Sequence, residues 1–368
     1  MKVLHIITRM NTGGPAVFLD HLTNAMGELG VKSVIAYGFC ESNETDYTES
    51  HKLGADLFNI GSLHRSLNPL HDLKSFIKIR KIIKQVKPDL VNTHTSKAGV
   101  LARLATKSVS RKTPVVHTFH GHLIYGYFAR YKSIVFTLIE KMMSRFTNVA
   151  VAVTAETKNS LTKLGIGRNL LWRVIQIGIP VRVVTQTTAP EQTFKLLWIG
   201  RFTQIKDPSL AVKVMKNLSN AGQERFELTM VGEGELYEEV KQEAKNLPVK
   251  FTGWLTNPFE TISAFDLLLI TSKNEGLPLV MLEAANFAKP TLSKNVGGIS
   301  EFITDNQTGY LVDGSADEIA KRIVELSNNK GLLLQTGINA NKLLNEKFSV
   351  KIMAKSYQDL YLQLVISK

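Results

Sequence analysis

The sequence predicts an α/β protein made of two doubly wound domains, each with a parallel sheet covered by helices on both faces. Short apolar runs alternate with helical patterns along the chain, as expected for successive βαβ units. The alternation is interrupted once, by the segment 180–194, which contains two prolines, and then starts again. A chain of 368 residues also fits two domains of about 100–200 residues each.

The first half opens with a strand, a glycine loop and a helix, the usual start of a doubly wound unit. The apolar run 3–7 is the strand, Gly13 and Gly14 lie in the loop, and apolar residues at helical spacing predict a helix from about Ala16 to Leu29. Further strands are expected at 31–39, 89–94, 113–118 and 149–153, with helices at 72–85, 98–106 and 131–146 and a closing apolar segment at 175–177.

The second half repeats the alternation of strands and helices. Strands are expected at 195–200, 226–231, 249–252 and 266–271, with helices at 208–218, 235–246 and 279–287. The stretch 348–364 again has apolar residues at helical spacing, which predicts a final helix.

The net charge of +13 belongs to the first half of the chain. Residues 1–180 carry 24 Lys and Arg against 11 Asp and Glu, whereas residues 181–368 carry 21 of each. Such asymmetry indicates an anionic partner for the first half: a membrane surface, a lipid phosphate or a nucleic acid. The alternative is that the charge serves solubility alone.

The composition indicates a protein without internal disulfides or membrane-spanning segments. Cys40 is the single cysteine, and no stretch approaches about 18 uninterrupted apolar residues. The apolar run at the N-terminus is too short for a signal sequence and is broken by Arg9. We therefore expect a cytoplasmic protein, attached at most to the surface of a membrane.

Two acidic residues flank the start of a helix that follows a buried strand. Glu275 precedes this helix, Glu283 lies inside it, and Pro278 fits its first turn. The free N–H groups near Leu279 and Val280 would form an anion site at the carboxyl end of the sheet, where a phosphate is the natural occupant. Each carboxylate could accept hydrogen bonds from sugar hydroxyls. The alternative is that Glu275 only stabilises the helix dipole and Glu283 is a surface acid.

These residues resemble the E-x7-E signature of the retaining glycosyltransferases of family 4, which have the GT-B fold. The resemblance extends, in order, over nearly the whole chain, and the ordered set is far more specific than any one motif. The matching segments are 12–16 (TGGPA), 117–122 (HTFHGH), 199–202 (IGRF) with Lys206, 231–234 (VGEG), 275–284 (EGLPLVMLEA), 296–301 (VGGISE) and 308–312 (TGYLV). One departure is 177–181 (IGIPV), where the family often has an acid.

The resemblance implies two Rossmann-like doubly wound domains that face each other across a cleft. The acceptor-side domain would comprise 1–180, with a C-terminal helix at about 349–368 crossing back to it, and the nucleotide-sugar-binding domain would comprise 181–348. We see no Asp-x-Asp triplet of the kind that holds a metal, so no metal or other cofactor is expected.

The resemblance also implies roles for matched positions. Glu275 would hold hydroxyls of the donor sugar and Glu283 the ribose, while Arg201 and Lys206 would neutralise the diphosphate and stabilise the leaving group. The remaining donor-binding positions are Gly13 and Gly14, where glycine lets the backbone approach closely, then Gly276, Leu277, Pro278, Leu279 and Val280, and Gly253 and Trp254 beside the base.

A histidine of the first domain is expected near the reacting sugar. His120 is favoured, because it ends a predicted strand and is followed by Gly121, and the family uses a histidine here to position donor sugar and acceptor. His117 and His122 remain rivals, whereas Thr118 and Phe119 are expected to pack in the core.

A basic amphipathic helix at 72–85 indicates either a lipid surface or an ordinary solvated helix face. Its cations are Lys74, Lys78, Arg80, Lys81 and Lys84, with Lys87 following, and its apolar residues include Phe76 and Ile79. The stretch 125–132 mixes aromatic residues with Arg130 and Lys132, and could line an acceptor groove or meet a membrane. Nothing resembles a nucleic-acid-binding module, so nucleic acid is disfavoured.

The function implied is retaining transfer of a hexose-type sugar from a nucleotide-diphosphate donor, with a UDP-sugar favoured. The acceptor would be a glycan or lipid-linked intermediate in cell-surface polysaccharide or glycolipid assembly, met at the inner face of the membrane. Two alternatives stay open: a nucleotide-sugar epimerase of the same fold, and a binder of nucleotide sugars without catalysis. A dinucleotide dehydrogenase is disfavoured because Gly232-Glu233-Gly234 lacks the third glycine of the G-x-G-x-x-G pattern.

Overall fold

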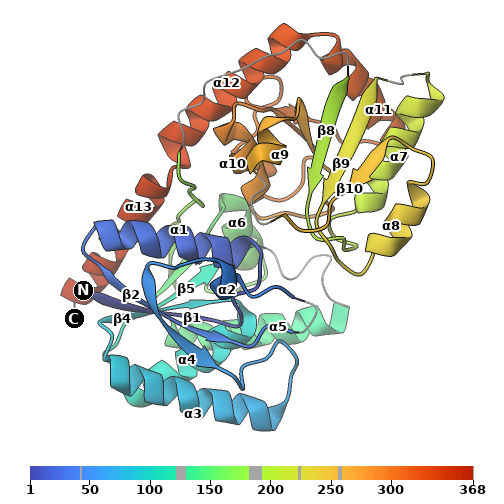
Figure 1. Ribbon diagram of the computed structural model, residues 1–368. Helices are drawn as coiled ribbons and strands as arrows, with labels where there is room; N and C mark the ends of the chain where they lie inside the picture. Colours follow the sequence, from blue (N-terminus) through green and yellow to red (C-terminus); the bar gives the residue numbers. More distant parts are fainter. Residues whose placement is uncertain (42–43, 122–129, 182–192, 223–224, 256–258, 368) are drawn as a thin grey trace. The chain divides into compact units, whose positions relative to one another are not determined.

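The computed structural model describes residues 1–41, 44–121, 130–181, 193–222, 225–255 and 259–367. Contacts divide the chain into two compact units, Met1–Pro180 with Ser349–Lys368, and Val181–Phe348 (Figure 1). Each unit contains one parallel sheet, and the two are described separately.

The first unit contains a seven-stranded sheet in the order β3-β2-β1-β4-β5-β6-β7. All of its strand pairs are parallel, and the order reverses between β1 and β4. Such a reversal leaves a crevice beyond the carboxyl ends of the central strands. The strands are β1 Lys2–Ile7, β2 Lys32–Gly38, β3 Ala55–Ile60, β4 Leu90–His94, β5 Val115–Phe119, β6 Val149–Ala152 and β7 Leu171–Val174.

Helices cover both faces of this sheet. They are α1 Gly14–Glu28, α2 Tyr47–Ser50, α3 Pro69–Val86, α4 Ser96–Val109, α5 Arg130–Met143, α6 Ala155–Lys163 and α13 Val350–Ile366, with a 3-10 turn at Ser144–Phe146. Figure 1 shows α1 on one face and α3 and α4 on the other. Ile79 and Ile83 of α3 and Leu4 and Ile6 of β1 belong to one buried core. The isoleucines share one face of the helix, and the two β1 residues share one face of the sheet.

The C-terminal helix α13 is part of the first unit. A Cβ at Gly178 would overlap the backbone of Ser349, so only glycine permits the two chain segments to meet here. The N–H of Val350 donates to the carbonyl of Ile179 (2.9 Å), and farther along α13 the hydroxyl of Tyr361 accepts from the side-chain amide of Asn92 (2.7 Å).

The second unit contains a six-stranded parallel sheet in the order β10-β9-β8-β11-β12-β13, with its reversal between β8 and β11. Its strands are β8 Phe194–Ile199, β9 Phe226–Val231, β10 Val249–Phe251, β11 Leu267–Ile270, β12 Thr291–Ser293 and β13 Tyr310–Leu311. Its helices are α7 Pro208–Asn220, α8 Tyr237–Glu243, α9 Phe259–Ser263, α10 Leu279–Asn286, α11 Ala316–Ser327 and α12 Lys330–Lys347, with a 3-10 turn at Ile299–Glu301.

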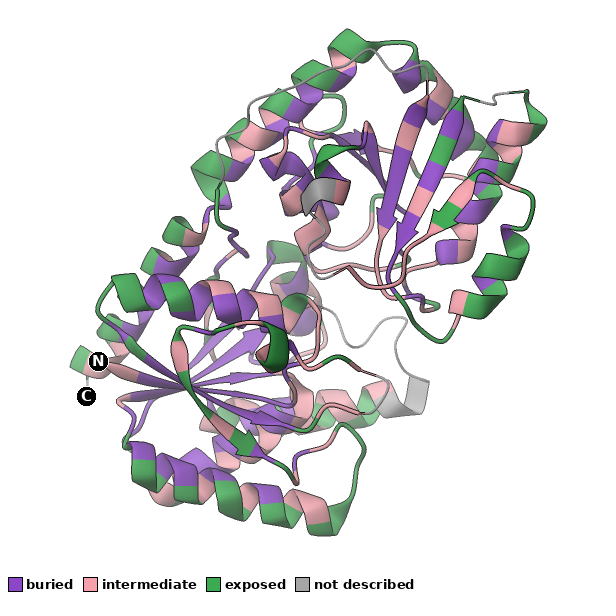
Figure 2. Cartoon of the chain, in the orientation of Figure 1, coloured by how far each residue is buried: buried purple, intermediate pink, exposed green. Residues whose placement is uncertain are grey.

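The structure differs from the sequence-based assignment at the edges of the first sheet and in elements that were not predicted, namely α2, α6, α9, α11, α12, β12 and β13. The strand next to β6 is Leu171–Val174, so the expectation of a closing segment at 175–177 was wrong by a few residues. The sequence analysis also missed β3, at the opposite edge. Both edge strands are largely exposed, and therefore lack the continuous apolar run that marks a buried strand (Figure 2). The expected linker 180–194 lies mostly outside the described residues.

Candidate functional site

Three strand-end loops of the second unit are packed backbone against backbone. The N–H of Gly200, after β8, donates to the carbonyl of Val231 (3.0 Å), and the N–H of Gly232 donates to the carbonyl of Gly253 (2.9 Å). Gly232 has a φ of 128°, and a Cβ there would overlap the carbonyl oxygen of Gly200. This packing fixes the loops that carry Arg201, after β8, and Trp254, after β10.

Lys206 is positioned by a hydrogen-bonded turn. The indole N–H of Trp198 donates to the hydroxyl of Thr271 (3.0 Å), which is 2.8 Å from the carbonyl oxygen of Asp207 and 3.0 Å from that of Lys206. The N–H of Lys273 donates to the carbonyl of Ile205 (2.8 Å). The turn before α7 is thereby tied to the end of β11.

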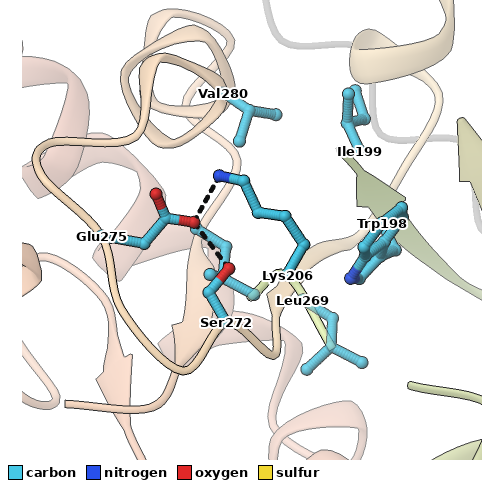
Figure 3. Close-up of a pocket in the computed structure, with 8 residues that line it drawn as sticks. Trp198, Ile199, Lys206, Leu269, Ser272, Glu275 and Val280 are labelled. Atoms are coloured by element: carbon cyan, nitrogen blue, oxygen red, sulfur yellow. Dashed lines mark hydrogen bonds and ion pairs between the residues drawn. The ribbon is translucent and has the colours of Figure 1, made fainter. Parts of the chain in front are cut away.

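Lys206, Ser272 and Glu275 form a charged cluster at the carboxyl end of the sheet (Figure 3). The Nζ of Lys206 lies 2.5 Å and the Oγ of Ser272 2.6 Å from the same oxygen, Oε1 of Glu275. The Glu275 side chain is 9% exposed and that of Lys206 28%. Charge-assisted bonds of this kind are short and strong, so they fix the carboxylate and leave Oε2 for other donors.

The cluster forms one side of a small pocket whose floor is apolar. The pocket is lined by Trp198, Ile199, Lys206, Leu269, Ile270, Ser272, Glu275 and Val280. The cluster offers a cation that can meet an anion and a carboxylate that can accept from a hydroxyl group.

The backbone of Gly297 and Gly298 packs against the backbone of Glu275. The N–H of Gly298 donates to the carbonyls of Glu275 (3.3 Å) and Gly276 (3.0 Å). Gly297 has a φ of 57°, and a Cβ there would overlap the carbonyl oxygen of Glu275 and lie 2.8 Å from its carbonyl carbon. The turn after β12 therefore sets the backbone position of Glu275.

Helix α10 begins at Leu279, as expected, but the placement of Pro278 in its first turn was wrong. Pro278 is its N-cap, with φ −66° and ψ 122°, rather than a residue of its first turn. The N–H groups of Leu279 and Val280 are the first in the helix, where no acceptor within the helix is available. Burial raises the pKa of Glu283, within α10, to about 7. This carboxyl is therefore poised between its neutral and charged forms near neutral pH, and is not an ordinary surface acid.

The predicted site residues of the first unit lie at the carboxyl ends of β1 and β5. Gly13 is the N-cap of α1, in extended conformation with φ 170°, and Gly14 is the first residue of the helix. His120 directly follows β5, and burial lowers its pKa to about 4. Its Nε2 lies 3.0 Å from Nδ1 of His94.

The two rivals of His120 differ from it in placement. His117 is buried, its Nδ1 lies 2.7 Å from the hydroxyl of Thr93, and its ring is 4.4 Å from that of Phe119. A Cβ at Gly99 would lie 2.6 Å from the ring of His117, so this histidine fills core space. His122, like most of the stretch 125–132, lies outside the described residues.

Several residues of these sites were missed by sequence reasoning: Trp198, Ser272 and Gly297 in the second unit, and His5 and His94 in the first. Ser272 carried a usable signal, because it closes a buried apolar strand just before Glu275. His5 and His94 also carried one, since each is a titratable residue inside a strand that is otherwise apolar or neutral.

Comparison with known proteins agrees with this architecture. The sequence model described as Glycosyltransferase Family 4 matches residues 12–195, and the one described as Glycosyl transferases group 1 matches residues 184–343. HepE of Anabaena, solved in complex with UDP and glucose, superposes with a TM-score of 0.81 over 99% of this chain and 100% of its own, at 19% identity. The two family models define the chain as a glycosyltransferase, and the two doubly wound parallel units have the GT-B fold of the solved neighbour.

More specifically, the chain belongs to glycosyltransferase family 4. It is 26% identical to the O-antigen biosynthesis glycosyltransferase WbnH of Escherichia coli, over 97% of this chain and 98% of that protein. It is 25% identical to the UDP-Gal:alpha-D-GlcNAc-diphosphoundecaprenol alpha-1,3-galactosyltransferase of Escherichia coli, over 88% and 87%. Among the described residues, no helix combines the length and the apolar character needed to cross a bilayer.

Proposed function

We propose that this protein transfers a hexose-type sugar from a UDP-sugar to a lipid-linked glycan, with retention of the anomeric configuration, in the assembly of a cell-surface polysaccharide. The observation that carries the proposal is the cluster of Lys206, Ser272 and Glu275 at the carboxyl end of the second sheet. The named relatives support the substrate class, since one uses UDP-Gal and an acceptor on diphosphoundecaprenol.

The second unit would hold the donor through the following groups. Glu275 accepts from hydroxyls of the sugar, the first N–H groups of α10 meet the diphosphate, and Glu283 accepts from the ribose. The base stacks beside Gly253 and Trp254. Lys206 already lies against Glu275. Its amine would also neutralise the incoming diphosphate, with no metal ion expected.

In the reaction, the acceptor hydroxyl attacks the anomeric carbon from the face that the diphosphate leaves. The bond to the diphosphate oxygen breaks, and the departing diphosphate takes the proton of the acceptor hydroxyl. Negative charge grows on the diphosphate in the transition state, where Lys206 and Arg201 stabilise it. His120 is the substrate-contacting residue that we propose for the first unit.

A thermal-shift screen tests the donor assignment. Purified protein is melted with UDP, GDP or ADP and with UDP-glucose, UDP-galactose and their N-acetyl forms. A ligand at 100 times its Kd adds about 2.7 kcal/mol of stability, so uridine ligands are expected to raise Tm clearly and the others not. A shift with GDP or ADP alone would overturn the UDP assignment, and no shift at all would favour a degenerate site.

The acceptor proposal includes contact with an anionic membrane surface, made by the first unit. In a parallel α/β sheet the crossover helices begin at the carboxyl ends of the strands, so α3 and α5 both start at the edge of the sheet where His120 lies. Their outward faces are apolar and flanked by lysine: Leu70, Leu73, Ile77, Lys74 and Lys78 on α3, and Ile134, Val135, Leu138 and Lys141 on α5 are exposed. Apolar residues ringed by cations are typical of helices that lie on anionic lipid.

Co-sedimentation with vesicles tests this surface. Phosphatidylglycerol vesicles are expected to bind the wild type at low salt, and Leu70→Ser combined with Leu138→Ser is expected to abolish binding. Ile338→Ser, on the exposed face of α12, is the matched control and should bind as the wild type does. Equal binding by the double variant and the control would contradict the assignment.

A further inference from the structure

Two buried histidines and a partly exposed one form a continuous row on one side of the first sheet. Nδ1 of His5, on β1, lies 3.3 Å from Nε2 of His94, at the end of β4, and Nδ1 of His94 lies 3.0 Å from Nε2 of His120. The rings of His5 and His94 are stacked at 5.5 Å, and Phe18 of α1 packs edge-on against His120 at 4.7 Å. Because β1 and β4 are neighbours at the point where the strand order reverses, the row leads from the sheet interior toward the carboxyl edge.

All three rings are neutral near neutral pH. Burial lowers the pKa of His5 to about 3 and of His120 to about 4, and burial together with the neighbouring histidines holds the pKa of His94 well below its ordinary value. A neutral imidazole has one N–H donor and one bare acceptor nitrogen. His94 uses both nitrogens in the row, so when one accepts, the other must donate.

The row therefore has only two arrangements of protons. In the first, every ring carries its proton on Nδ1, His5 donates to His94, His94 donates to His120, and the N–H of His120 is the free end. In the second, every ring carries its proton on Nε2, the direction reverses, and the N–H of His5 is the free end. Whether the free nitrogen of His120 is a donor or an acceptor therefore depends on which nitrogen of His5 carries the proton.

The environment of His5 favours the first arrangement. Within the part of the chain that the structure describes, the two end nitrogens of the row, Nε2 of His5 and Nδ1 of His120, are both buried and without a hydrogen-bond partner. His5 is completely buried, whereas His120 is partly exposed at the carboxyl edge of the sheet, so only at His120 can a ligand bring an acceptor to a free N–H. A buried N–H without an acceptor is rarer than a bare acceptor without a donor. The ring of Tyr361 lies 6.5 Å from that of His5, and its hydroxyl, which accepts from Asn92, keeps its own proton as a donor. The second arrangement would bury an N–H at this end.

We propose that His5 and His94 are positioning residues that hold His120 as its Nδ1–H tautomer, so that His120 offers a hydrogen-bond donor to an oxygen of the substrate. The row fixes a tautomer that free imidazole does not favour, and it keeps the proton on the side of the ring that the protein leaves unpaired. Among the described residues, Nδ1 of His120 has no partner of its own. The tautomer itself does not depend on the proposed function; only its use toward a sugar or phosphate oxygen does.

Long-range ¹H–¹⁵N correlation spectra of the ligand-free protein at pH 7 test this directly, because they distinguish the protonated from the bare nitrogen of each imidazole. The signals are assigned by their loss in His5→Phe and His120→Phe. We expect His5, His94 and His120 all to carry the proton on Nδ1. A proton on Nε2 in any of the three, or an average of both forms, would overturn the proposal.

A matched pair of variants tests whether the row is the cause. In His94→Asn the amide NH₂ can take the place of Nδ1–H as the donor to His120, whereas in the nearly isosteric His94→Leu it is lost. We expect His120 to stay Nδ1–H in His94→Asn and to move to Nε2–H in His94→Leu. An unchanged His120 in both variants would show that His94 does not set its tautomer. Thermal melts check that both variants are folded. The spectra report the tautomer whether or not the protein transfers a sugar, so the tautomer and the proposed function are tested separately.

Discussion

Gly297→Ala is expected to act on the site through the backbone of Glu275, against which Gly297 packs. Gly297 adopts φ 57°, so alanine would be strained there by about 1 kcal/mol. Its Cβ would also overlap the carbonyl oxygen of Glu275. Relieving that overlap costs about 1–3 kcal/mol more, or moves the Glu275 backbone away from Lys206 and Ser272.

Gly222→Ala is the matched control, because Gly222 has a similar φ of 68° and, among the described residues, no atom lies within 4 Å of the added Cβ. The control should lose about 1 kcal/mol of unfolding free energy, or about 2–4 °C in Tm, and keep full transferase activity. Gly297→Ala should lower the free energy of unfolding by about 2–4 kcal/mol. If the backbone of Glu275 moves instead, the loss of stability should be smaller, and kcat/KM should fall at least tenfold, which corresponds to about 1.4 kcal/mol of transition-state stabilisation. The assays are thermal denaturation and release of UDP in the presence of acceptor. Equal values for the two variants in both assays would refute the role assigned to Gly297.

Three further predictions concern the donor site and a buried ion pair between α4 and α5 of the first unit. The pKa of Glu283 is about 7 in the folded protein and near 4.5 in the unfolded chain, so between these pH values the native state binds one proton more. The free energy of unfolding of the wild type, relative to that of Glu283→Gln, should therefore fall by up to about 3 kcal/mol as pH rises from 4.5 to 7. Melting temperatures of the two proteins that change in parallel with pH would contradict this. Lys206→Met should lower kcat by roughly a hundredfold, because it removes the positive charge that stabilises the leaving diphosphate. A kcat within threefold of the wild type in steady-state kinetics would exclude this role of Lys206. Arg103→Met should cost about 3–5 kcal/mol in urea unfolding, since the bidentate ion pair of Arg103 with Glu140 (2.8 and 2.9 Å) is buried and the carboxylate would be left unpaired; a loss below about 1 kcal/mol would contradict this.

Two of the elements predicted from the sequence have residues that are buried on both sides or on one clear face, although β12 and α11, which are also buried in these ways, were not predicted. The strand at 149–153 reads as a continuous apolar run because helices cover both faces of β6, and α3 shows the helical period of its buried isoleucines. The strands β3 and β7 were missed or misplaced because an edge strand is stabilised by backbone pairing on one side only and leaves no apolar signature.

The candidate site could be predicted in part for a different reason. Glu275 and its helix lie in one contiguous motif, but Lys206 is 69 residues away, and only the fold brings its amine to the same carboxylate oxygen. His5 lies in β1, His94 at the end of β4 and His120 after β5, so nothing local in the sequence indicates that these three residues touch. The support of Glu275 by Gly297 is likewise a backbone contact that no side-chain pattern records.

The central claim is that the second unit holds a UDP-sugar for transfer with retention. The most direct test is a ¹H NMR time course of the transferred sugar's anomeric proton, with the UDP-sugar that gives the largest thermal shift and a diphosphate-linked lipid acceptor. The account predicts a product whose anomeric proton has the small coupling of the donor's α configuration from the first turnovers, formed at a much lower rate by Glu275→Gln. A β-linked first product, or conversion of the free nucleotide sugar to its epimer, would contradict it.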